Sequence, residues 1–79
     1  MFKDYALFNL AEAKQAIEQL MAEMQSDPDY DDGSYLVDMQ HIYWHLNSAW
    51  NGRNFDSSKS KLTNDLYDSF IQFPTDIDP

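Results

Sequence analysis

Apolar residues recur along this chain at the spacing of an α-helix. In residues 10–25 they come every three or four positions, and the glutamates lie away from them. This first stripe consists of Leu10, Ala13, Ile17, Leu20, Met21 and Met24. Asn9 followed by Glu12 is a variant of the capping box that starts helices, and Pro28 disfavours helix in the residue before it. The pattern predicts a helix over 10–25, preceded by an extended arm or a short turn.

Two further helices are predicted from the same spacing. The second covers residues 35–51, with Ser34 as its N-cap and Gly52 as a left-handed C-terminal residue. Its stripe consists of Tyr35, Met39, Ile42, Tyr43, Leu46, Ala49 and Trp50. The third covers residues 58–72, is capped by Asp56 or Ser57, and cannot continue past Pro74. Its main row consists of Leu62, Leu66, Phe70 and Phe73.

Three amphipathic helices joined by short loops predict an all-α fold in one small domain, residues 1–79. We expect an up-down-up three-helix bundle, with helices at about 10–25, 35–51 and 58–72 and an extended C-terminal tail. No segment alternates apolar and polar residues for long enough to predict a strand. The alternative architecture is a homodimer in which two such units complete a larger bundle.

The charge of the chain restricts its possible functions more than its length does. Acidic residues outnumber basic ones by 14 to 5, which gives a net charge of −9. This balance argues against nucleic-acid binding and against attraction to anionic membranes. The N-terminus lacks the pattern of a secretory signal, and no apolar stretch approaches the roughly 20 residues that span a bilayer. We therefore expect a soluble, cytoplasmic protein with either a basic partner, bound divalent cations, or an acidity that only maintains solubility.

Residues 26–38 concentrate the charge, with five aspartates and no basic residue. The segment resembles the calcium loop of an EF-hand in composition, with Asp27 as the first position, but not in register. The glycine needed at position 6 is Asp32, and the bidentate glutamate needed at position 12 is Asp38. The segment is therefore predicted to be a solvated connector, with weak calcium or magnesium binding as the other interpretation.

Asp38, His41 and His45 are spaced so that they share one face of the second helix. Histidines four residues apart reach a single zinc ion, and a carboxylate one turn earlier adds a third ligand. The zinc-protease motif places glutamate after the first histidine, where this chain has Ile42. The chain has no cysteine and no third histidine. Structural roles for the histidines are favoured, and a metal site is the alternative.

The aromatic residues of the second helix fall in two groups. Trp50 lies on the apolar stripe and is predicted to be core. Trp44 lies about 140° from that stripe, near Val37, at 100° per residue. Either the third helix covers Trp44, or it forms an exposed patch with Val37 and Tyr43, as aromatic anchors of protein interfaces do. Arg53 is expected to pair with Asp56 or Asp65, or to bind a carboxylate ligand.

The sequence contains no nucleophile with its base, no glycine-rich phosphate loop and no cofactor motif, so we do not expect an enzyme. The favoured function is a non-enzymatic, acidic protein-interaction module of the inhibitor, antitoxin or adaptor type. It would bind a basic partner through the 27–38 loop and the aromatic helix face. The predicted partner-binding residues are Asp29, Asp31, Asp32, Val37, Tyr43, Trp44 and Arg53. The alternative is a small divalent-metal-binding protein that uses Asp38, His41 and His45.

Overall fold

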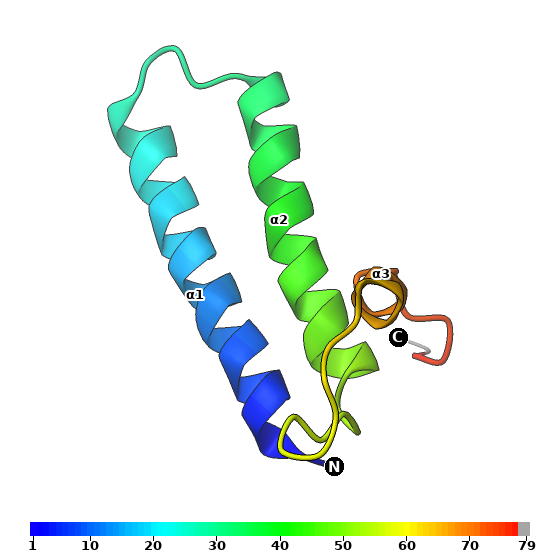
Figure 1. Cartoon of the computed structure of the whole chain (residues 1–79). Helices are drawn as coiled ribbons and strands as arrows, with labels where there is room; N and C mark the ends of the chain where they lie inside the picture. Colours follow the sequence, from blue (N-terminus) through cyan, green and yellow to red (C-terminus); the bar gives the residue numbers. More distant parts are fainter. Residues whose placement is uncertain (78–79) are drawn as a thin grey trace.

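Three helices form the protein in the computed structural model, which describes residues 1–77. They are α1 (Lys3–Ser26), α2 (Asp32–Asn51) and α3 (Asn64–Phe70). The helices α1 and α2 run antiparallel as a long hairpin, and α3 lies across the C-terminal end of α2 (Figure 1). The all-α, three-helix fold class is confirmed, and the described residues include no strand. No helix in residues 1–77 combines the length and apolar character needed to cross a membrane.

The helix α1 begins at Lys3, not near residue 10. The expected N-cap, Asn9, lies inside the helix, where it is buried and its amide nitrogen donates to the Tyr5 carbonyl. The predicted arm is therefore helical. The start of the chain is also fixed in space, because the Phe2 backbone N–H donates to the carbonyl of Arg53 at 2.8 Å.

The other two N-caps also differ from prediction. Asp31, not Ser34, caps α2, because its carboxylate accepts from the Ser34 N–H at 2.9 Å. Thr63 caps α3 by accepting from a backbone N–H one turn later. Asp56 is not available for that role, since its carboxylate accepts from both the backbone and the hydroxyl of Ser58. The helix α3 consequently spans seven residues, fewer than predicted.

The seam between α1 and α2 is built mainly from small side chains. Ala6, Ala13 and Leu20 are buried on α1, and Ile42 and Ala49 are buried on α2. Short alanine side chains let two helices approach closely, and the larger apolar residues then remain outside the contact. The prediction that both apolar stripes form the core is wrong for these residues, which are exposed: Leu10, Ile17, Met21, Met24, Tyr35, Tyr43 and Leu46.

An aromatic cluster fills the open end of the hairpin. The Tyr5 ring lies 5.2 Å from that of Phe55 and 5.7 Å from that of buried Phe70. Gly52 allows this packing, because a Cβ atom there would lie 2.5 Å from the Tyr5 ring. Its φ is −93°, so Gly52 does not adopt the predicted left-handed conformation. The glycine provides space for Tyr5.

Two asparagines of α2 hold the end of α3. Asn47 donates to the Ile71 carbonyl at 2.9 Å. Asn51 donates to the carbonyls of Phe70 and Gln72 at 2.9 and 2.7 Å. Carbonyls at the end of a helix have no partner within that helix, so the amide side chains of α2 satisfy them. The amides at the end of α2 thereby fix α3 and the start of the tail.

The described part of the tail returns to α2. The Trp50 indole N–H donates to one carboxylate oxygen of Asp76 at 2.9 Å, and the Arg53 guanidinium lies 3.4 Å from the other. The prediction of an extended tail is therefore corrected for residues 74–77, because Asp76 anchors them. Residues 78–79 lie outside the described part of the chain.

Candidate interaction surface

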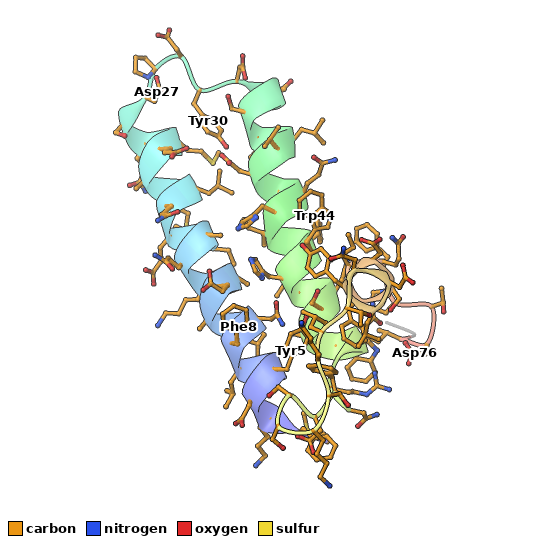
Figure 2. The ribbon with its side chains drawn as sticks, in the orientation of Figure 1. Tyr5, Phe8, Asp27, Tyr30, Trp44 and Asp76 are labelled. Carbon is orange, nitrogen blue, oxygen red and sulfur yellow. The ribbon has the colours of Figure 1, made fainter. Side chains whose placement is uncertain are left out.

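Three carboxylates line a hollow at the loop end of the hairpin. Glu23 comes from the end of α1, Asp27 from the loop and Asp38 from the start of α2. The rest of the lining consists of Tyr30, Gly33, Ser34 and Val37. Figure 2 shows Asp27 and Tyr30 at this end of the molecule. We call these seven residues the acidic hollow; they include no lysine or arginine.

Hydrogen bonds within the loop orient two of these carboxylates. The Tyr30 hydroxyl donates to Asp38 at 2.7 Å, and the Asp29 backbone N–H donates to Asp27 at 2.9 Å. Burial, together with the contact to Asp38, raises the pKa of Tyr30. Tyr30 therefore remains a neutral donor at ordinary pH and ties the loop to α2. The acidic hollow is preorganised by its own loop.

The predicted loop residues do not line the acidic hollow. Asp29, Asp31 and Asp32 are exposed nearby, in the loop and the first turn of α2. Asp31 has a structural role, since hydrogen bonds from Ser34 lower its pKa. Sequence reasoning missed Glu23 and the contribution of Tyr30. The available signal was the tight connection between two helices, which brings the end of one beside the start of the next.

An aromatic groove lies farther along α2. It is formed by α2 and the segment that follows α3, and is lined by Gln40, Tyr43, Trp44, Asn47, Ile71, Gln72 and Phe73. Trp44 is 42 % exposed, so the third helix does not cover it. The rings of Tyr43 and Phe73 lie 5.2 Å apart. Val37, 63 % exposed, belongs to the acidic hollow and lies two helical turns before Trp44.

Arg53 lies away from this surface, at the opposite end of α2. Its guanidinium stacks 3.9 Å from the Trp50 ring and donates to the Trp50 carbonyl. Its carboxylate partner is Asp76, so the prediction of Asp56 or Asp65 is wrong. The hydrogen bond from Trp50, with the nearby guanidinium, lowers the pKa of Asp76. The returning tail, which the sequence pattern did not indicate, supplied the partner. Trp50 itself is only half-buried.

The histidine pair contacts α1. The rings of His41 and His45 are 4.7 Å apart, and Nδ1 of His45 lies 2.9 Å from Oδ1 of Asn9. Since the Asn9 nitrogen already donates to Tyr5, its oxygen accepts and His45 Nδ1 carries the hydrogen. Asp38 is engaged with Tyr30. Within residues 1–77 no three histidine or acidic side chains are placed to hold a metal ion.

Acidification from pH 7 to pH 5 is expected to destabilise the protein through His45. Burial, and secondarily the neighbouring His41, lowers the pKa of His45 below its usual 6.5, while Glu12 opposes the shift. The unfolded chain then binds the proton more readily than the folded chain, so the free energy of unfolding falls as the pH drops below 6.5. Urea titrations at pH 5, 6 and 7 measure this slope.

The matched variants separate the two histidines. His45→Gln removes the perturbed group and should flatten the dependence in this window. His41→Gln leaves the contact between His45 and Asn9 intact, and should retain the part of the slope caused by burial. An unchanged slope in His45→Gln would assign the effect to another group.

The protein is an acidic hairpin of two long helices, and a short third helix packs at the end of the hairpin opposite the loop. Val37 of its acidic hollow and Trp44 of its aromatic groove lie within about 20° of each other around α2. Comparisons with protein-family models, curated proteins and solved structures found no match.

Proposed function

We propose that this protein is a non-enzymatic interaction module that binds a basic helical segment of a partner protein along α2. The observation that carries this proposal is that Val37 of the acidic hollow and Trp44 of the aromatic groove lie within about 20° of each other around α2, on adjoining parts of its surface. A single partner segment that follows α2 contacts both. An inhibitor, an antitoxin or an adaptor would each use such a surface.

The acidic hollow supplies the charge recognition. Glu23, Asp27 and Asp38 face a lysine or arginine side chain with three carboxylates and with no basic residue lining the hollow. Hydrogen bonds between charged groups are shorter and stronger than those between neutral groups. The net charge of −9 also attracts a basic partner from a distance and speeds its encounter.

The aromatic groove supplies the apolar anchor. Trp44 is 42 % exposed and Phe73 is 65 % exposed, and tryptophan is among the residues that most often dominate binding energy. Val37 and Trp44 are seven residues apart, which is about 10.5 Å along the helix. Asp38, the carboxylate that α2 contributes to the hollow, lies about 9 Å along the helix from Trp44 and about 120° around it. A partner helix that crosses α2 over Val37 would reach both with a basic residue and an apolar residue about one heptad apart. The expected ligand is therefore a basic amphipathic helix.

A synthetic helical peptide tests the proposal. The probe carries lysine and leucine one heptad apart, and a second peptide carries glutamate in place of each lysine. Calorimetry should detect binding of the lysine peptide and none of the glutamate peptide. Asp27→Asn, Asp38→Asn and Trp44→Ala should each weaken binding about tenfold or more, as loss of a charged hydrogen bond or an aromatic anchor does.

Glu18→Gln is the matched control, because it removes the same charge from α1 at an exposed residue outside the hollow. It should change the dissociation constant by less than about threefold, the effect of general electrostatics on an exposed site. Equal weakening by Glu18→Gln and Asp27→Asn would reduce the interaction to non-specific charge attraction. Failure of the lysine peptide to bind would contradict the proposed function.

A further inference from the structure

The hairpin has a second exposed surface that the proposed function does not use. It is made of large apolar side chains from both long helices, each between 39 % and 54 % exposed. We call it the apolar face, and its members are Leu10, Ile17, Met21, Met24, Tyr35 and Leu46. Contiguous exposed apolar surface of this kind marks an interaction site.

The two helices contribute to one continuous face. At 100° per residue, the α1 members lie about 20–80° from the seam residue Ala13, and the α2 members lie about 20–40° from Ile42. In both helices these residues are displaced from the seam residue in the same direction of rotation, as viewed from the N-terminus of each helix. Because the helices are antiparallel, both sets therefore project to the same side of the hairpin. Leu10 and Leu46 accordingly line one shared apolar hollow.

The molecule also exposes more surface than its mass predicts. Its accessible area is 6022 Å², against about 5,000 Å² expected for a folded monomer of 9.3 kDa. The Cα radius of gyration is 14.4 Å, against about 11.6 Å for a compact chain of this length. The difference of about 1,000 Å² is comparable to the roughly 800 Å² that each partner buries in a standard protein interface.

The excess area fits a second copy of the chain, and the charges beside the apolar face bear on how two copies would pack. Lys3 and Lys14 lie at the helical angles of this face, whereas Glu12, Glu18 and Glu23 lie at other angles of α1. Two chains of net charge −9 nevertheless repel each other at a distance, so the distribution of that charge matters for how they would pack. The loop end carries the aspartates of residues 27–32 and no basic residue. The open end carries Lys3 and Arg53 together with Asp4, Asp56 and Asp76.

We propose that two copies of this chain pack their apolar faces together in an antiparallel arrangement. A two-fold axis then keeps the two acidic loop ends apart and places the open end of each copy, where both charge signs occur, beside the loop end of the other. The four long helices form a bundle. The exposed apolar residues that flank the seam in one copy become the core between two copies.

The dimer leaves the acidic hollow and Trp44 exposed, while Leu46 at the edge of the apolar face adjoins Tyr43 and Phe73 of the groove. Trp44 lies about 160° around α2 from Leu46, on the opposite side of the helix. Each dimer therefore presents two acidic hollows and two aromatic grooves on its outer sides. This inference does not depend on the proposed binding of a basic segment.

Sedimentation equilibrium tests the assembly, and the expected mass is twice 9.3 kDa. The double variant Ile17→Gln, Met21→Gln should sediment as a monomer at the same concentration. Phe8→Gln removes a side chain that is 55 % exposed elsewhere on α1, and should remain dimeric. Circular dichroism of each variant checks that helix content is retained.

A distance measurement tests the orientation without disturbing the apolar face. The chain has no cysteine, so Ser26→Cys introduces a single site for a spin label at the loop end. The antiparallel dimer separates the two labels by about 36 Å, the length of α1. A parallel dimer places them roughly 10–15 Å apart, the spacing of packed helices.

Three results overturn this inference: a monomer up to about millimolar concentration, a dimer that survives the double variant, or a short distance between labels. If the chain were a monomer, the apolar face would instead be a binding site for a helix of another protein. A monomer that still binds the lysine peptide would leave the proposed function standing. A dimer that does not bind the lysine peptide would leave this inference standing and contradict the proposed function.

Discussion

Phe70→Ala is expected to lower the free energy of unfolding by about 3–5 kcal/mol, the usual cost of removing a buried phenylalanine. Phe70 is 9 % exposed and packs on Tyr5 and Phe55, so one ring connects α3 with α1 and with the segment after α2. Urea denaturation followed by circular dichroism measures the loss.

Phe73→Ala is the control for this prediction. Phe73 loses the same ring, but it is 65 % exposed and contacts Tyr43 in the aromatic groove. We expect a loss of less than about 1 kcal/mol, the range of an exposed aromatic pair. Equal losses in the two variants would show that the cluster at the open end is not the main core of the fold.

Ile42→Ala is expected to destabilise the hairpin by about 2–5 kcal/mol. Ile42 is 4 % exposed and is one of the few large side chains in a seam otherwise built mainly from alanine. Its removal leaves a cavity between two helices that are already in close contact. The unfolding midpoint, together with faster amide exchange in the middle of α1 and α2, reports the loss.

Val37→Ala makes the same class of change on the same helix, but Val37 is 63 % exposed. Alanine has the higher helix propensity, so this variant should be as stable as the original chain or slightly more stable. A comparable loss at both positions would contradict the assignment of the seam to the side of α2 that carries Ile42.

The three helices could be predicted because their signals are local. Apolar spacing identified the elements, and Pro28 and the aspartates around it identified the connection between α1 and α2. The start of α1 was missed because Asn9 has the residue type of a cap. Its real partner is His45, 36 positions later, and no local pattern indicates that contact.

The direction in which the stripes face could not be predicted from periodicity. An apolar stripe shows which side of a helix avoids water, but not which neighbour covers it. The alanines within the stripes, such as Ala13 and Ala49, form the contact between α1 and α2. The larger residues lie next to that contact, and the apolar face is the result.

The interaction surface was predicted in part. Exposure of Trp44 was one of two outcomes considered, and the short α3 decides between them, because it covers only the last part of α2. The hollow itself depends on loop closure, which turns Tyr30 toward Asp38. The partner of Arg53 was predicted wrongly. Asp76 lies in the C-terminal tail, which returns to α2 through a hydrogen bond with Trp50.

The two asparagines at the end of α2 recognise main-chain atoms. Asn47 and Asn51 bind the carbonyls of residues 70–72, and every amino acid provides such a carbonyl. Side chains at Gln72 and Phe73 can therefore change without releasing the segment from α2. One wall of the aromatic groove is thus free to diversify, and related chains can acquire different binding preferences while keeping the same attachment.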